Sequence, residues 1–418
     1  MLPVLRQRDF FLLWLGGLIS LLGDRAMRVA LPVYVYQQTG STLATAAMAA
    51  SYYLPAVLLG SLAGVFTDRW DRRRVMIGAN FIQAGVILLL LLVRSADWLW
   101  LVYLVSFTDT AVSLFVQPAQ GALIPNLVDE EQFVPANALG ALGTNLGRLA
   151  GPPVGGVLIG LFGLGSVALV DGASFLLAAT LFALISVTRK PAPEAMTEAS
   201  RIGLWREWRE GLALVRRDRL IAALFVVLSV TSFGGAMIDP LIAPFVLSVL
   251  RRGPATLGWL PTVGAAGGIV AGLLIGRIGR RFQPRRLVGA GTVLTGLLMV
   301  ALYNQTWILA VAALWFVLSL PVVAANVGAQ TLLQAGVPDR YRGRVYGALN
   351  TAMAMLSLGS VALSGALAEV VGVVAMLSVA GGVTIVAGLL ALLLLPSSGR
   401  SFESAGGDRP AQVGVKRS

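Results

Sequence analysis

The 418-residue sequence contains no cysteine and no histidine, and only 12% of its residues are charged. The missing cysteine excludes disulfides and thiolate metal sites, and the missing histidine excludes imidazole ligands, the usual catalytic triads and a side chain that titrates near neutral pH. Soluble proteins contain about 25% charged residues because their surface is polar. These absences argue against a soluble enzyme, a disordered protein and a small disulfide-rich domain. We expect no cofactor, no bound metal and no catalytic residue.

The chain is instead rich in apolar sequence, with 57% hydrophobic residues and 48 glycines. A helix needs roughly 20 mostly apolar residues to cross a bilayer, and twelve stretches meet this requirement. They lie at 10–36, 42–66, 74–94, 98–124, 133–160, 163–187, 220–248, 255–277, 286–303, 306–334, 343–367 and 370–396. We therefore predict an all-α membrane protein with twelve transmembrane helices in two six-helix bundles, at 1–187 and 220–397.

A polar linker at 188–219 separates the two predicted bundles, and a polar tail that we expect to be flexible follows at 398–418. Within the linker, Trp205, Trp208 and Leu212 recur at helical spacing with charged residues between them. This pattern predicts a short amphipathic helix on the inner membrane face. The helix is either a simple connector or a regulatory element.

The net charge of +12 results from 32 basic and 20 acidic residues, and by itself it could suggest nucleic-acid binding. If both chain ends are cytoplasmic, 26 basic residues fall in inner segments, three in outer loops and three within spans. Cytoplasmic segments of membrane proteins carry such an excess. We therefore predict a multi-pass protein of the cell inner membrane with both termini cytoplasmic. Its basic residues would meet the anionic lipids of the inner leaflet, and no nucleic acid.

Two loops at equivalent places in the two halves share a pattern of glycine and arginine. The loop after 42–66 reads Gly-Val-Phe-Thr-Asp-Arg-Trp-Asp-Arg-Arg-Arg, and the loop after 255–277 reads Gly-Leu-Leu-Ile-Gly-Arg-Ile-Gly-Arg-Arg. Duplicated halves are a hallmark of secondary transporters. The first loop resembles the signature of the major facilitator superfamily, whose fold has two pseudo-symmetric six-helix bundles. Phe66, Thr67 and Asp71 differ from that consensus.

A second motif lies in the span at 133–160 and reads Gly-Arg-Leu-Ala-Gly-Pro-Pro-Val-Gly-Gly. It is similar to the antiporter motif that accompanies export in this superfamily. Its members here are Gly147, Gly151, Pro152, Gly155 and Gly156. We expect the glycines at four-residue steps to pack closely against the eighth span, and the proline to bend the helix. With the arginine-rich run at 338–344, the chain resembles the drug:proton antiporter branch that includes macrolide and enterobactin exporters.

The resemblance also implies a cytoplasmic gate. In the family, the acidic residue of the first loop, here Asp68, faces the positive N-terminal end of the eleventh span and holds the cytoplasmic side closed in the outward-open state. The alternative is that the arginines of this loop only orient the protein in the membrane. The gate candidates are Gly64, Asp68, Arg69, Arg72, Arg340 and Arg344.

Polar and charged side chains within the spans are the candidate transport site, because charge is costly inside a bilayer and therefore indicates function. Several lie at steps of three or four residues, so each set follows one face of its helix. The resemblance implies that the first, fourth, seventh and tenth spans line a central cavity. The candidates are Asp24, Arg28, Asp109, Ser113, Gln117, Arg148, Asp171, Asp239, Asn326, Gln330 and Gln334.

A proton-coupled carrier without histidine has to use carboxylates. Burial disfavours an ionised carboxyl group and a neighbouring arginine favours it, so an aspartate that exchanges an arginine for water or substrate can bind and release a proton. We rank Asp24 first as the proton site, then Asp109, then Asp171. The alternative is that these residues form static ion pairs that fix the helix register, such as Asp24 with Arg28 or Asp109 with Arg148.

We therefore predict a monomeric transporter, not an enzyme, that exports hydrophobic or cationic small molecules in exchange for protons by alternating access. An exporter or flippase of one metabolite, siderophore or lysophospholipid is an open alternative, and so is an uptake symporter. A polytopic enzyme or sensor would need a catalytic constellation or an extramembrane domain, and neither is visible. The sequence has no Gly-x-x-x-x-Gly-Lys-Ser/Thr loop, which argues against transport driven by ATP.

Overall fold

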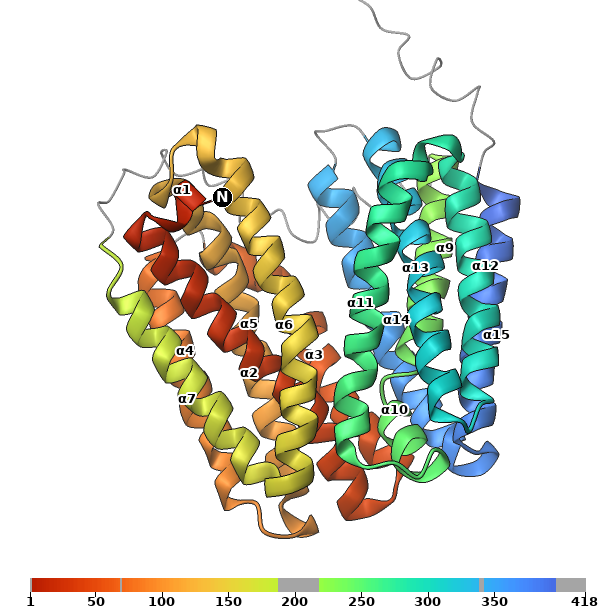
Figure 1. Cartoon of the computed structure of the whole chain (residues 1–418), viewed down its shortest axis with the longest axis horizontal. Helices are drawn as coiled ribbons and strands as arrows, with labels where there is room; N and C mark the ends of the chain where they lie inside the picture. Colours follow the sequence, from red (N-terminus) through yellow and green to blue (C-terminus); the bar gives the residue numbers. More distant parts are fainter. Residues whose placement is uncertain (1, 68–69, 187–217, 338–341, 396–418) are drawn as a thin grey trace, which may run out of the picture.

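The fold was obtained as a computed structural model that describes residues 2–67, 70–186, 218–337 and 342–395. The predicted amphipathic helix of the linker and the polar tail lie outside these residues. The described chain is helical throughout, with long helices joined by short connections (Figure 1). The predicted all-α architecture in two bundles is confirmed.

The first half of the chain forms one bundle, which follows the short helix α1 (Leu2–Leu5). Its membrane-length helices are α2 (Arg8–Thr39), α3 (Thr42–Thr67), α4 (Arg72–Leu88, extended by η1, Leu89–Leu92), α5 (Leu99–Leu127, after η2, Ala96–Trp98), α6 (Phe133–Phe162, after η3, Glu130–Gln132) and α7 (Leu164–Ala183). Many large apolar side chains on the outer faces are exposed, for example Leu161 at 71%. An apolar outer surface is what contact with lipid requires.

The second half of the chain forms the other bundle. Its elements are α9 (Arg219–Ala236), α10 (Ile242–Pro244), the π-helical turn η5 (Phe245–Val249), α11 (Pro254–Ile278, followed by η6, Gly279–Arg281), α12 (Pro284–Tyr303), α13 (Ile308–Gly336), α14 (Arg342–Val371) and α15 (Val373–Leu394). Eleven helices of the described chain are long and apolar enough to cross a membrane. The remaining predicted span is α6, which has 30 residues but many glycines that lower its hydropathy.

The seventh predicted span, 220–248, is not one continuous helix as expected. Helix α9 ends at Ala236, the chain turns through 237–241, and the span resumes as α10 and η5. Pro240 and Pro244 explain the break, because proline has no backbone N–H and its ring clashes with the preceding turn of a helix. Asp239 therefore lies in a non-helical turn. Irregular backbone at membrane depth is tolerated where it is buried in protein or lines a cavity.

The two bundles converge at one end of the molecule and diverge at the other (Figure 1). One end of the molecule contains α1 and the last turn of α15, and we call it the terminal end. We call the opposite end the distal end. Two helix pairs form most of the contact between the bundles, namely α3 with α14 and α6 with α11. The second and eleventh spans thus pack together, as do the fifth and eighth, which gives the interface the same two-fold pattern as the sequence repeat.

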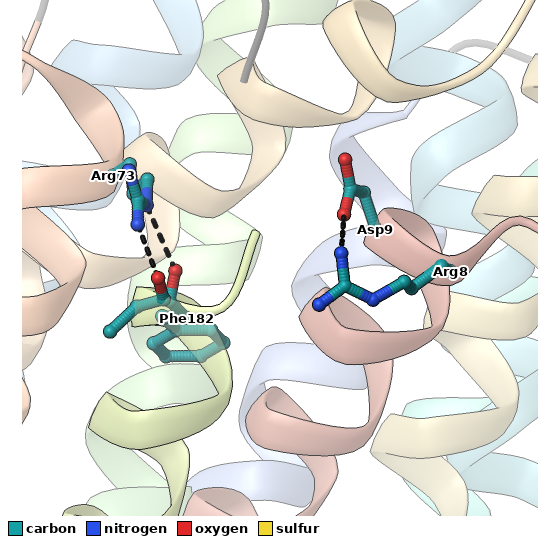
Figure 2. Close-up of polar contacts among 5 residues, drawn as sticks. Arg8, Asp9, Arg73 and Phe182 are labelled. Atoms are coloured by element: carbon teal, nitrogen blue, oxygen red, sulfur yellow. Dashed lines mark hydrogen bonds and ion pairs between the residues drawn. The ribbon is translucent and has the colours of Figure 1, made fainter. Parts of the chain in front are cut away.

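Equivalent arginines at the terminal end bind equivalent helix ends in the two halves. Arg73, at the start of α4, donates hydrogen bonds to the carbonyls of Phe182, at 3.1 Å, and Ala183, at the end of α7 (Figure 2). Arg285, at the start of α12, donates to the carbonyl of Leu392 near the end of α15. Arginine is well suited to this position because the last carbonyls of a helix lack partners and form the negative end of its dipole. Arg73 therefore caps the end of α7, in addition to any role in orienting the protein in the membrane.

Gly40 joins α2 to α3 with a positive φ of 64°, a backbone conformation that side chains with Cβ adopt only at a cost. A Cβ atom here would meet nothing within 4 Å. We expect Gly40→Ala to lower the stability by about 1 kcal/mol through backbone strain alone. Gly85→Ala in α4 is the matched control, because its Cβ is equally free and its backbone is helical. Thermal unfolding in detergent would test this: a lower melting temperature is expected for Gly40→Ala only.

Candidate functional site

Two cavities lie about midway along the helices. The first has a volume of about 80 Å³ and lies between α2, α3, α4 and α5 of the first bundle. Its lining residues are Leu21, Asp24, Arg25, Met27, Arg28, Leu31, Tyr52, Ile87, Ser106, Asp109, Thr110, Ser113 and Gln117. The structure therefore brings together five predicted site residues: Asp24, Arg28, Asp109, Ser113 and Gln117.

The two carboxylates of the first cavity have different partners. Gln83 of α4 donates hydrogen bonds through Nε2 to Asp109 Oδ1 at 2.9 Å and to Ser113 Oγ at 3.0 Å. Asp24 interacts electrostatically with Asp109, Arg28 and Arg25, but no described residue donates a hydrogen bond to it. The side chain of Asp24 is partly exposed in the cavity. Asp24 is thus the carboxylate that is free to exchange its partner.

Arg28 is the central cation of this region. Its guanidinium lies 4.8 Å from the centre of the Tyr52 ring, in a cation–π contact. Its charge acts on Asp24, Asp109 and also Asp239 of the second bundle. The arginine therefore stabilises several carboxylates at once and is not dedicated to one of them.

The static ion pairs considered from the sequence are not formed. Across the described part of the chain, the one pair with a nitrogen–oxygen distance within 4.0 Å is Arg8–Asp9, at 4.0 Å near the terminal end (Figure 2). Exposed pairs of this kind contribute little to stability. Neither Asp24–Arg28 nor Asp109–Arg148 is such a pair. The charge of Arg28 is shared between Asp24 and Asp109, and Arg148 lines the other cavity.

Asp171 of α7 lies behind the first cavity and does not line it. Its side chain is 1% exposed, and Ser174 Oγ is 3.3 Å from its Oδ1. The other oxygen, Oδ2, has no hydrogen-bond partner among the described residues. Gly23 of α2 makes this position possible, because a Cβ there would overlap the carboxylate. Asp171 is electrostatically linked to Asp24 and Asp109 through this contact of α7 with α2.

The second cavity is larger, about 550 Å³, and lies between the bundles among α6, α11 and α13. Its lining residues are Asn145, Arg148, Gly264, Ala265, Gly268, Ile269, Gly272, Leu273, Trp315, Leu318, Ser319, Val322 and Val323. Cavities of this size accommodate drug-sized molecules, which typically occupy sites of about 300–1,000 Å³. The polar stripe predicted on the tenth span does not reach either cavity: Asn326, Gln330 and Gln334 are exposed on α13, closer to its terminal end. Gln330 accepts a hydrogen bond from Tyr346 of α14 at 3.2 Å.

Asp239 lies in neither cavity but joins the two bundles. Its carboxylate accepts a hydrogen bond from Tyr53 of α3, across the interface. The neighbouring carbonyl of Pro240 accepts a hydrogen bond from Thr45 of α3 at 2.8 Å. The break in the seventh span thus exposes polar backbone and one carboxylate, and both are satisfied by α3 of the other bundle.

Further hydrogen bonds between the bundles involve the distal halves of their helices. They join Tyr36 to Ser248 at 2.8 Å, Thr42 to the Gly365 carbonyl at 2.8 Å, Thr262 to the Leu149 carbonyl at 2.8 Å, and Ser41 and the Leu43 amide to Glu369. The largest buried apolar cluster also contains residues of both bundles, such as Val33, Phe245 and Leu377. Towards the terminal end, the clusters around Phe182, Leu139 and Leu333 are each confined to one bundle. The distal end is therefore closed, and the bundles separate towards the terminal end.

The glycine face of α6 does not pack against the eighth span as we expected. Gly147, Gly151 and Gly155 face α2, where added Cβ atoms would overlap Leu21, Arg25 and Ala26 respectively. The contact with the eighth span, α11, is made by the next residue, Gly156. Its added Cβ would lie 2.9 Å from Gly258 Cα, and Pro152 meets the same glycine through its carbonyl. The two faces are adjacent on the helix, so the motif packs α6 against α2 and α11 at once.

The predicted gate at the terminal end lies largely outside the described residues. Asp68, Arg69 and Arg340 are not described, and Gly64 and Arg344 are placed within α3 and α14 without their surroundings. Arg72 is described. Its Nη1 donates a hydrogen bond to the Ala122 carbonyl near the end of α5 at 2.8 Å.

Among the residues that sequence reasoning missed are Arg25, Tyr52 and Trp315, which line the cavities, and Gln83, which is hydrogen-bonded to Asp109 of the first cavity. Gln83 left a signal in the sequence, because it lies with Asn80 at a spacing of three residues in an otherwise apolar span. Both side chains are buried, at 2% and 1% exposure. Arg25, next to Asp24, was read as an ordinary basic residue within a span. Tyr52 and Trp315 are indistinguishable from other aromatic residues without the tertiary structure.

A protein family and several curated proteins match most of the chain. The family described as transmembrane secretion effector matches residues 1–406. Macrolide efflux protein A of Streptococcus pyogenes is 25% identical over 371 residues, which cover 87% of this chain and 90% of the relative. The enterobactin exporter EntS of Salmonella typhimurium is 26% identical over 396 residues, or 92% of each chain. The uncharacterized MFS-type transporter YfiS of Bacillus subtilis is 27% identical over 400 residues, or 94% of each chain.

Solved structures with the same fold are those of transporters. A bacterial homologue of the human lysosomal transporter Spinster, inward-facing and unoccupied, superposes with a TM-score of 0.68 at 17% identity, over 93% of this chain and 95% of that chain. A bacterial homologue of the iron transporter ferroportin, also inward-facing, gives 0.69 at 16% identity, over 93% and 98%. The chain therefore belongs to the transmembrane secretion effector family, within the major facilitator superfamily of membrane transporters.

Proposed function

We propose that the protein exports hydrophobic small molecules across the cell membrane in exchange for protons, by alternating access. The observation that supports this most is the first cavity, where the carboxylate of Asp24 lies beside two arginines without a hydrogen-bond donor. A buried carboxylate of this kind is costly in a membrane and suggests a role in ion movement. The relatives named as macrolide and enterobactin exporters support export as the direction.

The proton would be exchanged at Asp24. The nearby charges of Arg28 and Arg25 favour the ionised carboxylate, and burial favours the protonated form. A change in the distance between Asp24 and these arginines therefore changes its proton affinity. In our scheme Asp24 releases its proton to the cytoplasm as the substrate binds, and takes up a proton from outside as the substrate leaves.

Alternating access would follow from the two ends of the molecule. The distal end is closed by contacts between the bundles, whereas the bundles separate towards the terminal end (Figure 1). The excess of arginine at the terminal end supports a cytoplasmic location for it. With this orientation the closed distal end would face outward and the arrangement would be an inward-facing state, which we propose for a monomer in the plasma membrane. Substrate from the cytoplasm would then enter the second cavity between the bundles.

Proton coupling can be measured in everted membrane vesicles from cells that express the protein. Respiration acidifies the vesicle interior, and an acridine dye reports the pH difference through quenching. A macrolide such as erythromycin and the siderophore enterobactin are the first compounds to test, because of the named relatives. For a transported compound, we expect the dye fluorescence to recover as protons leave the vesicles.

Vesicles without the protein and vesicles that carry Asp97→Asn, a change in an exposed distal connection, are the controls. The first should show no recovery and the second the same recovery as the unchanged protein. Accumulation of compound without any change in fluorescence would contradict coupling to protons. Acidification on adding the compound would indicate symport, and so contradict the proposed direction.

A further inference from the structure

The second cavity has a charge pattern that the proposed function does not explain. It lies between the bundles, and Arg148 of α6 is the one charged side chain among its described lining residues. The other polar side chains of the lining are Asn145, Trp315 and Ser319. The hydroxyl of Ser319 already donates to the Gly264 carbonyl at 2.7 Å. A ligand in this cavity would therefore meet one cation in largely apolar surroundings.

Arg148 has no compensating partner in the described structure. No described residue forms a hydrogen bond or an ion pair with it, and Arg25 of α2, a positive neighbour, cannot compensate its charge. The carboxylates Asp24 and Asp109 line the first cavity instead. The side chain of Arg148 is exposed where the cavity is open, so it is accessible to a ligand, and a charge among apolar residues favours an anionic partner. Here the missing partner can be supplied by a ligand.

The walls of the cavity are suited to an apolar body. Gly264, Gly268 and Gly272 follow one face of α11 at four-residue steps. Added Cβ atoms at Gly268 and Gly272 would meet nothing within 4 Å, so open space lies above the backbone. Trp315 of α13 packs against Gly264, because its Cδ1 lies 2.7 Å from where a Cβ of Gly264 would be. Ile269, Leu273, Leu318, Val322 and Val323 complete the lining.

We propose that the second cavity binds an amphiphile with a single anionic group, which pairs with Arg148, and an apolar body, which lies along α11 and α13. This inference rests on the proposed export function and names its substrate class. It differs from the cationic compounds expected from the sequence, because a permanent cation would be repelled by Arg148. Arginine binds carboxylate, sulfonate and phosphate groups through two parallel N–H donors. The same chemistry is offered by a soluble organic anion and by the head group of an anionic lipid.

A matched pair of fluorescent probes tests the charge requirement. The probe 8-anilinonaphthalene-1-sulfonate is an anion with an apolar body, and N-phenyl-1-naphthylamine has the same body without the sulfonate. Binding is measured on protein in nanodiscs of neutral lipid, after subtraction of empty nanodiscs. For the unchanged protein we expect saturable binding of both probes. For Arg148→Gln we expect the anion to bind about tenfold or more weakly, the scale of a hydrogen bond to a charged group, and the neutral probe to bind as before.

Two further variants separate charge from shape. Arg148→Lys keeps the positive charge but loses the two parallel N–H donors, so its affinity for the anion should lie between those of the unchanged protein and Arg148→Gln. Gly268→Leu places a side chain in the space above α11, where an added Cβ meets nothing within 4 Å, and should weaken both probes. Equal binding of the anion by Arg148→Gln and the unchanged protein would overturn the proposal. The proposal would also be overturned if Arg148→Gln bound neither probe and Arg148→Lys did not restore binding of the anion.

Addition of lysophosphatidylglycerol distinguishes the two sources of the anion. We expect the sulfonate probe to bind in discs that contain no anionic lipid. Displacement of the bound probe by lysophosphatidylglycerol in the unchanged protein, but not by free organic anions, would assign the anionic group to a lipid head group, and the reverse would assign it to a soluble compound. The binding assay involves no proton gradient, so its failure is distinct from failure of proton-coupled export. Proton-driven export of a cationic dye such as ethidium by the unchanged protein, at a rate that Arg148→Gln does not increase, would overturn the substrate class and leave the export function standing.

Discussion

Replacing Asp24 by asparagine should abolish proton release from acidified vesicles while leaving substrate binding intact. The change keeps the size and shape of the side chain and removes the group that binds the proton. Arg25 and Arg28 stay in place, but they lose the carboxylate whose proton affinity they would control. We expect the rate of substrate-induced proton release to fall by about 100-fold or to background, because a positioned proton-transfer group contributes about 10²–10⁴-fold to a rate.

Two measurements make this result specific. Ligand-induced thermal stabilisation of the purified variant should match that of the unchanged protein, which shows that the site is folded and binds. Exchange of labelled for unlabelled substrate across the membrane, which needs no net proton movement, should also persist. If proton release continues in Asp24→Asn, Asp24 is not the proton site.

The other two carboxylates provide the comparison. Asp109 is held by Gln83, and an asparagine can accept the same hydrogen bond, so Asp109→Asn should give a smaller loss of proton release. Asp171 is enclosed behind the cavity, so Asp171→Asn should act mainly on stability. Loss of coupling in Asp109→Asn with normal coupling in Asp24→Asn would move the proton site to Asp109.

The sequence predicted the architecture well because a bilayer imposes a simple requirement on it. Each span needs about 20 apolar residues whatever its neighbours are, so length and hydropathy locate the helices without tertiary information. The seventh span shows the limit of this reasoning. Its hydropathy is continuous from 220 to 248, but Pro240 and Pro244 divide it, and the freed backbone is satisfied by Thr45 of the other bundle.

The candidate site was predictable where one helix determines it. Asp24 and Arg28 share a helix face, and so do Asp109, Ser113 and Gln117; in the structure both sets line the first cavity. Contacts between helices were not predictable from periodicity. The amide of Gln83 that holds Asp109 comes from α4, and its approach depends on how α4 and α5 rotate against each other.

The same limit applies to α6, where adjacent residues face different helices. Gly155 contacts α2, Gly156 contacts α11, and Arg148 reaches the second cavity. A rotation of one residue, about 100° around a helix axis, separates these directions. The glycine spacing alone indicated that α6 packs closely, but it did not indicate which helix each glycine would meet.

The contact between α3 and α14 should be essential for closure of the distal end. The Gly365 carbonyl accepts a hydrogen bond from Thr42 at 2.8 Å, and an added Cβ would lie 2.9 Å from the Thr42 carbonyl and would overlap Ala46. We expect Gly365→Val to separate the two helices. Overpacking of this kind costs about 1–3 kcal/mol, which corresponds to about 5- to 150-fold in the population of the closed distal state. Because the proposed alternating access requires each end to close in turn, we expect Gly365→Val to remove most transport activity.

Spin labels can follow this change, since the chain has no cysteine and two introduced cysteines would be the labelling sites. Leu43 and Val370 are suitable, because they lie at the distal end of α3 and α14 and are 50% and 84% exposed. Double electron–electron resonance should show a short distance in the unchanged protein and a shift to longer distances with Gly365→Val. Gly359→Val on the same helix is the control, because its Cβ would meet nothing within 4 Å, and it should change neither the distance nor transport. Normal transport and an unchanged distance in Gly365→Val would show that closure of the distal end does not depend on this contact.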